Sequence, residues 1–291
     1  MNELVLVRGG GDLATGVAHR LHRCRFRVIL TEIAQPMAIR RPVSFAEAVY
    51  DGFHKVEGIT SRLVCGLVEA TAILERGEIP VLIDPEATRA LRLEPAVVVD
   101  AILAKRNTGT RITCAPLVIG LGPGFTAGVD VHAVVETNRG HNLGRVILDG
   151  SAEPDTGIPG PINGYGRERL VKAPADGVFQ PVVSIGSLVE AGQILGRVGI
   201  YPVHAPLSGV LRGMIRGGIF VSRGLKIGDV DPRNKVEHCY TISDKARAIA
   251  GGVLEAILML RTGKLRSQKQ GAGSRKRIKM RQLAESCIQR L

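Results

Sequence analysis

The sequence predicts an α/β protein with a Rossmann-like, mostly parallel sheet, followed by a smaller duplicated β-domain and a C-terminal helix. Short apolar runs rich in Val and Ile alternate with helical stretches in the first half, as expected for strands covered on both faces. A glycine-rich turn follows the first run, and the second half contains an internal repeat. The predicted parts are a cofactor-binding domain over 1–165, the β-domain over 166–240, a helix over 241–262 and a basic, disordered tail over 263–291.

The apolar runs of the first half each have the length of one buried strand. They are residues 4–7, 27–31, 80–83, 96–99, 116–121, 131–135 and 146–148. Leu13, Val17 and Leu21 are at helical spacing after the first run, and residues 63–76 form another helical stretch. This alternation predicts a doubly wound sheet, in which ligands bind outside the carboxyl ends of the strands.

The turn after the first run fits the pattern G-x-G-x-x-A, with Gly9, Gly11 and Ala14 at the defining positions. Gly9 allows the tight turn, Gly11 lets the backbone approach a phosphate, and the N-terminus of the next helix attracts an anion. The charge of Asp12 opposes a phosphate there, and its alternative role is to cap the helix. Glu32 ends the second run, where an acceptor for a ribose hydroxyl belongs. The alternative is a Rossmann-like fold that has lost its nucleotide.

A second glycine-rich loop, residues 120–130, follows a later apolar run and has four glycines within nine residues. Two such loops at the ends of parallel strands predict one site that is framed from both sides. Nearby acidic and cationic side chains complete the predicted pocket. The predicted cofactor-binding residues are Gly9, Gly10, Gly11, Asp12, Thr15, Glu32, Arg40, Arg41, Lys105, Gly120, Gly122, Pro123, Gly124, Phe125, Asp130 and Arg139. No catalytic residue is assigned.

The repeat in the second half aligns residues 171–198 with 203–230, and ten of 28 positions are identical without a gap. Repeated glycines mark turns and repeated valines mark strand cores. The pattern resembles the half-motif of biotinyl and lipoyl carrier domains, which implies a barrel-sandwich fold of two interlocking halves. Those domains carry their modified lysine between the halves, but residues 199–202 contain none. We therefore expect no attached biotin or lipoate, and a structural or partner-docking role.

The C-terminal helical stretch begins after Ser243, its predicted N-cap, and contains Gly251 and Gly252, which predict close packing against another element. The five cysteines are scattered and include no C-x-x-C pair, so we expect reduced thiols and no metal site. No apolar run reaches the roughly 18 residues of a membrane span, and the start has no signal-peptide pattern. A cytoplasmic protein is predicted.

The formal net charge is +12, but it is unevenly placed. From Arg261 onward there are ten basic residues and one acidic residue, a net charge of +9. The remaining residues have a net charge of only +3, and aromatic residues for base stacking are only 3% of the chain. Nucleic acid and membrane are therefore not favoured as partners.

Long segments are together similar to the YqeB-type family, among them GGGDLATGVAHRL, DAILAKRNTGT, APLVIGLGPGFTAGVDVHAVVETNRGHNLGRV, KIGDVDPR and TISDKARAIAGGVLEAIL. These are accessory proteins of selenium-dependent molybdenum hydroxylase systems, with a Rossmann-like part similar to XdhC-type cofactor-insertion proteins. The resemblance covers about residues 1–260. It implies a maturation factor that binds a molybdopterin-type cofactor or a dinucleotide and delivers it to an apo-hydroxylase.

Two questions stay open at the level of sequence. The glycine turn and Glu32 also fit an NAD-dependent oxidoreductase acting on a small metabolite, with His132 and His141 as candidates for proton transfer by position alone. Cys65 and Cys114 are either handlers of sulfur or selenium or inert core thiols. The oligomeric state is left open.

Overall fold

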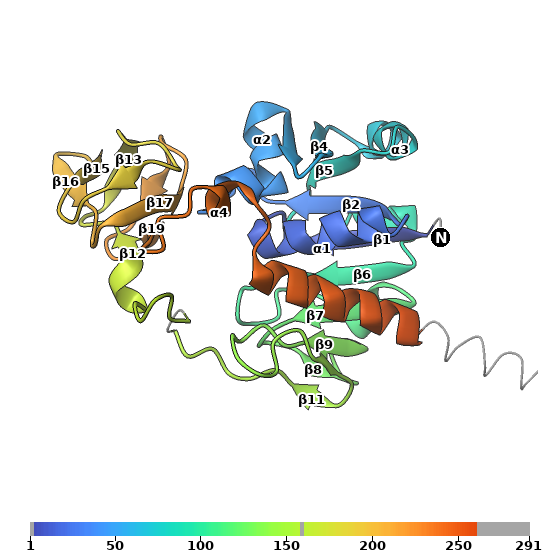
Figure 1. Ribbon diagram of the computed structural model, residues 1–291. Helices are drawn as coiled ribbons and strands as arrows, with labels where there is room; N and C mark the ends of the chain where they lie inside the picture. The colour runs from blue at the N-terminus through green and yellow to red at the C-terminus, as the bar shows by residue number, and fades with distance from the viewer. Residues whose placement is uncertain (1–2, 158–159, 261–291) are drawn as a thin grey trace, which may run out of the picture.

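The computed structural model describes residues 3–157 and 160–260, and its largest element is a nine-stranded mixed sheet (Figure 1). Its strands are β1 (Leu4–Arg8), β2 (Arg27–Glu32), β3 (Phe53–Val56), β4 (Ile59–Val64), β5 (Ile79–Ile83), β6 (Val97–Asp100), β7 (Leu117–Leu121), β9 (Ala133–Val135) and β10 (Val146–Ile147). Their order is β10-β9-β7-β6-β1-β2-β5-β4-β3. Neighbours from β9 to β4 are parallel, whereas β3 and β10 pair antiparallel at the two edges.

Helices cover both faces of this sheet. The sheet and these helices together are called the sheet region. The helix α1 (Asp12–Arg23) and a C-terminal helix, residues 244–260, share one apolar core with Val5 and Val7 of β1. The helix α3 (Leu67–Glu75) packs on the other face with Leu6. This alternation follows from the period of two along a strand.

Short elements connect these parts. They are η1 (Arg41–Val43), η2 (Phe45–Glu47), α2 (Ala48–Asp51), η3 (Ala90–Leu93), η4 (Ile112–Cys114), η5 (Arg167–Arg169), α4 (Glu237–Tyr240) and a two-stranded sheet of β8 (Thr126–Ala127) and β11 (Gly150–Ser151). In the described part of the chain, no helix has the length and apolar character needed to cross a membrane.

A second unit, called the β-module, comprises residues 170–231 and has two four-stranded antiparallel sheets around its own apolar core. One sheet contains β12 (Leu170–Lys172), β19 (Lys226–Asp231), β17 (Gly209–Met214) and β14 (Leu188–Val189). The other contains β16 (Tyr201–His204), β15 (Ile194–Val198), β13 (Gly177–Pro181) and β18 (Phe220–Val221). It projects from one end of the large sheet (Figure 1).

The predicted fold class is wrong. The described residues form one large mixed sheet and separate antiparallel sheets, and they include no barrel of the biotinyl or lipoyl type. The repeated glycines and valines indicate short strands and turns, but they do not determine whether the two copies of the repeat pair into a closed barrel. The edge strand β3 was not predicted either, because His54 and Lys55 interrupt its two apolar residues, so it has no continuous apolar run. The predicted tail, 263–291, and the last predicted helical residues, 261–262, lie outside the described residues.

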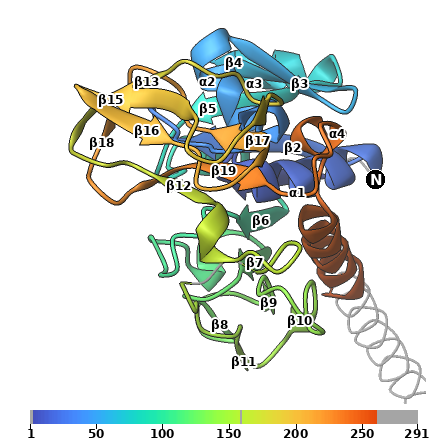
Figure 2. The same ribbon diagram turned by 60° about the vertical axis from the view of Figure 1, so that its left-hand side comes forward.

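The C-terminal helix returns from the β-module to the sheet region and lies beside α1 (Figures 1 and 2). The Ser243 hydroxyl accepts a hydrogen bond from the Ala246 N–H at 3.2 Å, which is the predicted N-cap. A Cβ atom on Gly16 would lie 2.8 Å from the Cβ of Ala246, so the two helices pack backbone to backbone at this point. Gly252 similarly packs against the carbonyl oxygen of Gly144.

The β-module docks on the segment that follows β2. The Met214 N–H donates to the carbonyl oxygen of Ile39 at 2.8 Å, and Arg41 Nε donates to the Met214 carbonyl oxygen at 2.8 Å. Arg216 forms an ion pair with Asp51 and lies 4.5 Å from the ring centroid of Tyr50. The module is thus attached by side-chain contacts as well as by its two chain connections.

Candidate functional site

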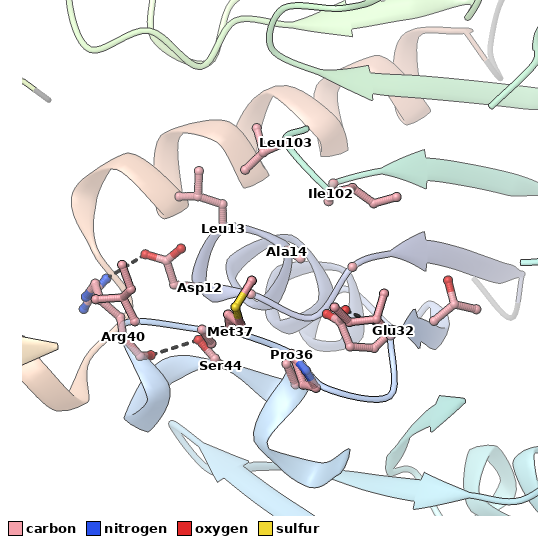
Figure 3. Close-up of a pocket in the computed structure, with 18 of the residues that line it drawn as sticks. Asp12, Leu13, Ala14, Glu32, Pro36, Met37, Arg40, Ser44, Ile102 and Leu103 are labelled. Atoms are coloured by element: carbon pink, nitrogen blue, oxygen red, sulfur yellow. Dashed lines mark hydrogen bonds and ion pairs between the residues drawn. The ribbon is translucent and has the colours of Figure 1, made fainter. Parts of the chain in front are cut away.

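A cavity of about 400 Å³ lies at the carboxyl ends of β1, β2 and β6 (Figure 3). It is lined by Gly9, Gly11, Asp12, Leu13, Ala14, Thr31, Glu32, Ile33, Pro36, Met37, Ala38, Ile39, Arg40, Ser44, Ala46, Pro85, Ala101, Ile102, Leu103, Lys226 and Asp229. The strand order reverses between β1 and β6, which is where open α/β sheets bind ligands. This cavity is called the first cavity.

The glycine turn opens to the first cavity at Gly11. Gly9 has a φ of +96° and a Cβ there would lie 3.1 Å from the carbonyl oxygen of Ala101, whereas a Cβ on Gly10 would lie 2.9 Å from the Ala46 nitrogen. Gly11, the N-cap of α1, has no atom within 4 Å of an added Cβ. The side-chain direction at Gly11 is therefore open space, beside the N-terminus of α1, whose first N–H groups attract an anion.

Thr15 and Gly10 hold the turn from behind. The Thr15 hydroxyl donates to the Gly10 carbonyl oxygen at 3.1 Å and accepts a hydrogen bond from the Phe45 N–H at 2.8 Å. The Ala46 N–H also donates to the Gly10 carbonyl oxygen, at 2.9 Å. These contacts make both residues part of the scaffold, and neither lines the first cavity.

Glu32 lies at the end of β2 in the wall of the first cavity (Figure 3). Its carboxylate accepts hydrogen bonds from the backbone N–H groups of Gly10 at 2.7 Å and Ile33 at 2.8 Å. Burial raises the pKa of this carboxyl, and the two N–H donors partly oppose that shift. Each carboxylate oxygen retains a lone pair, so Glu32 can still accept a hydrogen bond from a ligand hydroxyl.

Apolar side chains form the remaining wall of the first cavity and are unusually exposed. Ile33, Met37 and Ile102 line it with 42%, 48% and 38% of their surface accessible. Exposed apolar surface inside a cavity is typical of a ligand site. The polarisable thioether of Met37 is well suited to contact an aromatic ring.

Asp12 is the first residue of α1, and the capping position before it is Gly11, so Asp12 does not take the alternative role of N-cap. Its carboxylate instead lies 3.4 Å from Arg40 Nη1. The other terminal nitrogen of Arg40 donates to the carbonyl oxygens of His238 and Thr241, both at 2.9 Å. Arg40 thus links the glycine turn to the chain segment that leaves the β-module.

A second cavity of about 560 Å³ shares Asp12, Leu13, Arg40, Lys226 and Asp229 with the first, so the two are neighbours with a common wall. Its walls come from the sheet region, the β-module and the C-terminal helix. The other lining residues are Lys105, Pro123, Thr137, Asn138, Arg139, Glu153, Pro154, Asp155, Thr156, Gly157, Gly160, Ile162, Arg169, Leu170, Arg212, Ser243 and Lys245.

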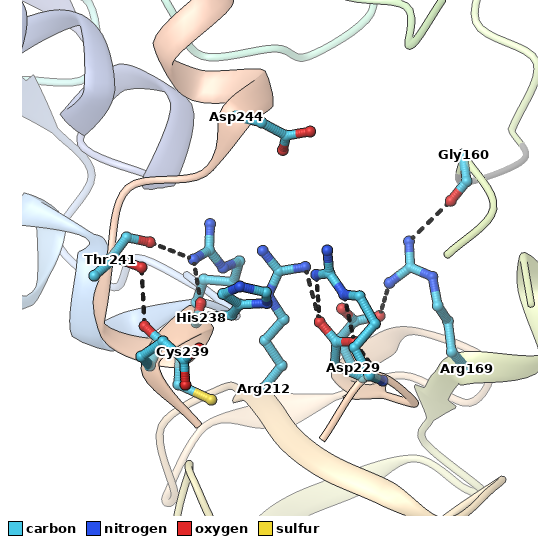
Figure 4. A network of polar contacts seen from close by, with 12 residues as sticks. Gly160, Arg169, Arg212, Asp229, His238, Cys239, Thr241 and Asp244 are labelled. Atoms are coloured by element: carbon cyan, nitrogen blue, oxygen red, sulfur yellow. Dashed lines mark hydrogen bonds and ion pairs between the residues drawn. The ribbon is translucent and has the colours of Figure 1, made fainter. Parts of the chain in front are cut away.

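Basic side chains outnumber acidic ones in the second cavity, by seven to four. Most are paired: Lys105 with Asp155 at 2.6 Å, Arg139 with Asp244 at 2.7 Å, Arg212 with Asp231 at 3.4 Å, and Arg169 with Asp229 (Figure 4). Within the described residues, Lys226 and Lys245 have no ion-pair partner. Burial lowers the pKa of both lysines, and Arg139 adds to the shift of Lys245.

Half of the sequence-predicted site residues line these cavities. They are Gly9, Gly11, Asp12, Glu32, Arg40, Lys105, Pro123 and Arg139. The other half do not line either cavity, namely Gly10, Thr15, Arg41, Gly120, Gly122, Gly124, Phe125 and Asp130.

The glycines of the second loop make room for this chain's own residues. An added Cβ would meet the Phe125 ring from Gly120, the Thr137 hydroxyl from Gly122 and the Arg106 backbone from Gly124. The Asp130 carboxylate accepts a hydrogen bond from the Thr126 N–H at 2.8 Å. The loop therefore borders the site mainly through Pro123.

The cationic residues of the second half were not predicted as site residues. Arg169, Arg212, Lys226 and Lys245 all line the second cavity. Lys226 begins the segment KIGDVDPR, which belongs partly to the repeat over 203–230 and also contributes to the family resemblance. A lysine inside a repeat gives no signal of which neighbouring unit it will face.

The cysteines and metal-ligating residues are located elsewhere. Cys65 is exposed and Cys114 is half-buried, and neither lines the two cavities. Across residues 3–157 and 160–260, no three His, Cys, Asp or Glu side chains are grouped so that they could hold a metal ion.

The chain was compared with known proteins and structures, and no protein-family model matches it. It is 51% identical over 259 residues to "Uncharacterized protein YqeB" of Escherichia coli (strain K12), which covers 89% of this chain and 48% of that protein. The chain thus spans about half the length of this relative.

Solved structures are matched only weakly. A succinylglutamate desuccinylase/aspartoacylase from Rhodobacter sphaeroides is 15% identical, with 80% of this chain and 87% of that chain covered and a TM-score of 0.26. The product-bound ectoine utilization protein EutE (DoeB) from Ruegeria pomeroyi is 16% identical, with 79% and 85% covered and a TM-score of 0.24. TM-scores this low support no inference about fold or activity.

Proposed function

We propose that this protein is a cytoplasmic accessory factor that binds a phosphate-bearing cofactor, either of molybdopterin type or a dinucleotide, and delivers it to a selenium-dependent molybdenum hydroxylase. The observation that carries the binding role is the open N-terminus of α1 at Gly11, which faces a cavity with an exposed apolar wall. The client enzyme is proposed from the sequence resemblance alone.

The residues of the two cavities fit such a cofactor. A flat heteroaromatic ring would contact Met37, Ile33 and Ile102, and Glu32 would accept a hydrogen bond from a hydroxyl. Phosphate oxygens would accept hydrogen bonds from the first N–H groups of α1. The cofactor would bring the metal or redox chemistry, and this chain would bind, orient and shield it.

A matched pair of variants tests the binding role. Gly11→Asp places a carboxylate in front of α1, and we expect binding of molybdopterin cofactor or its dinucleotide form to fall at least tenfold, which is about 1.4 kcal/mol. Gly66→Asp is the control, because Gly66 is the N-cap of α3, has the same open space and lines neither cavity. Binding would be measured by calorimetry. Equal affinity of both variants and the wild type would overturn the proposal.

An NAD-dependent oxidoreductase is the second candidate, favoured by the glycine turn together with Glu32. The histidines considered for proton transfer lie elsewhere. His132 Nδ1 accepts a hydrogen bond from the Val118 N–H at 3.0 Å, and His141 is exposed and lines neither cavity. Titration with NADH, followed by fluorescence, separates the two functions: absence of saturable binding at millimolar NADH would remove this candidate.

A further inference from the structure

The second cavity has features that a single-phosphate site does not need. We propose that it binds the polyanionic end of the ligand, a group with at least two neighbouring anionic centres such as a pyrophosphate, held by Lys226 and Lys245. This inference rests on the proposed function and adds to it where the charged end of the ligand lies. The ligand would therefore be oriented with its ring in the first cavity and its charged end in the second.

Lys226 and Lys245 reach this cavity from distant parts of the chain. Lys226 begins β19 of the β-module, and Lys245 lies in the first turn of the C-terminal helix. Both are half-buried, and within the described residues neither forms an ion pair. Carboxylates beyond ion-pair distance attract both lysines, Asp229 and Asp12 for Lys226 and Asp12 for Lys245. Partial desolvation of the two ammonium groups still costs folding free energy, part of which an anionic ligand would recover on binding.

Arginines around the lysines add fixed positive charge. Arg40, Arg169 and Arg212 line the second cavity and are 9%, 8% and 9% exposed. In each, the Nε–H has no hydrogen-bond partner among the described residues, although the terminal nitrogens are engaged. Burial lowers the pKa of Arg212, and the charge of Arg40 lowers it further. Seven basic and four acidic side chains line the cavity, an excess of positive charge that Asp244 and Asp231 reduce from outside the lining through Arg139 and Arg212.

Lys226 lines both cavities. A single ligand that extends from the first cavity into the second would therefore contact this side chain. A ring on Met37 and Ile102 would lie in the first cavity, with Arg40 on the far side of the N-terminus of α1 (Figure 3). Its charged end would pass Arg40 toward Lys226. Lys245 would then meet the second anionic centre. A monophosphate could satisfy only the first part of this path.

The test is a series of ligands of increasing charge, titrated by calorimetry at two salt concentrations: AMP, ADP, ATP and inorganic pyrophosphate. We expect affinity to rise at least tenfold from AMP to ADP, and the gain to shrink at higher salt. The double variant Lys226→Met/Lys245→Met should lose this gain while retaining AMP binding. Lys226→Arg/Lys245→Arg should retain the gain. Lys172→Met is the control, because Lys172 is exposed on β12 and lines neither cavity.

Three outcomes would overturn the inference: no gain from AMP to ADP, the same gain in the double methionine variant, or pyrophosphate binding that does not compete with ADP. Competition between pyrophosphate and ADP that Lys226→Met/Lys245→Met abolishes would support it. Failure here is distinguishable from failure of the proposed function, because loss of binding in Gly11→Asp does not depend on the two lysines. Thermal unfolding of each variant confirms that it is folded, since methionine keeps the apolar stem of lysine.

Discussion

Gly11 and Lys226 line the same cavity although one lies near the start of the chain and the other far into its second half. Gly11 was predictable, because a glycine at that place in G-x-G-x-x-A has a local physical reason. Lys226 was not, because its role depends on where the β-module docks, and no local pattern encodes that contact. Glu32 was also predictable from its position at the end of β2.

At the scale of single residues, we predict that anion binding weakens at a lower pH than the titration of an exposed lysine would produce. Burial lowers the pKa of Lys226. In the unliganded protein this lysine therefore loses its proton at a pH below the ordinary lysine pKa of about 10.4. Affinity for ADP is present below this lowered pKa and falls as the pH rises through it. Because burial also lowers the pKa of Lys245, Lys226→Arg should shift only part of the fall to higher pH, and Lys226→Arg/Lys245→Arg, which stays charged at both positions, should shift all of it. Calorimetry across the alkaline range measures these profiles.

The control for this pH profile is Lys172→Arg, at the exposed lysine that pairs in register with Lys226 across β12 and β19. It should follow the wild-type curve. A fall that is the same in Lys226→Arg as in the wild type would show that another group titrates. Proton uptake on binding, measured in buffers of different ionisation enthalpy, should be smaller in Lys226→Arg.

At the scale of elements, strands lie at all seven predicted runs of the first half, because short Val-rich and Ile-rich runs are a strong local signal. The β3–β4 hairpin was missed. Its turn consists of Glu57 and Gly58, with φ values of 42° and 88°, so it has positive φ at both central positions as a type I′ turn does. Glutamate is a rare residue at such a position, which hid the hairpin. The predicted helix over 63–76 consequently began inside β4.

Adjacent glycines in the C-terminal helix give a matched prediction at this scale. Gly252→Ala should lower the free energy of unfolding by about 1–3 kcal/mol, because its Cβ would collide with the carbonyl oxygen of Gly144. Gly251→Ala should leave stability unchanged or raise it by up to about 1 kcal/mol, since its Cβ would meet only the end of the Arg20 side chain at 3.3 Å. Urea unfolding measures both. Equal effects would contradict the close packing at Gly252.

At the scale of the whole molecule, the β-module lies between β11 and the C-terminal helix in the chain, but it docks beside the carboxyl ends of β1 and β2. This docking brings residues of the β-module into the walls of both cavities. The sequence predicted the order of these parts and could not predict their contact. That contact depends on pairs such as Arg216 with Glu47 and Asp51, which are far apart in the chain and have no local signature. The cationic residues Arg169, Arg212 and Lys226 were not predicted as site residues for the same reason.

We predict that Arg216→Met loosens the docking of the β-module. It removes the ion pairs to Glu47 at 3.1 Å and Asp51 at 2.6 Å and leaves the buried Glu47 carboxylate with Arg41 at 3.6 Å. Stability should fall by about 1–3 kcal/mol, and the Met214 N–H, which donates to Ile39 across the contact, should exchange faster with solvent hydrogen.

The control for this loosening is Arg223→Met, at an exposed arginine of the same module. It should leave the exchange of the Met214 amide unchanged. If Arg216→Met destabilises the protein without faster exchange at Met214, the loss lies within one unit and the docking is held by other contacts. Exchange followed by mass spectrometry gives the readout.

The C-terminal helix has a consequence for how the protein is made. The apolar face formed by β1, β2 and α1 is completed by Ile249, Val253 and Ile257, which are synthesised only after the entire β-module. During translation this face emerges from the ribosome without these side chains and stays so while about two hundred further residues are added, at roughly 5–20 residues per second. The β-module can close its own core before then. The sheet region is therefore expected to reach its final fold after the β-module, although its strands are made before that module.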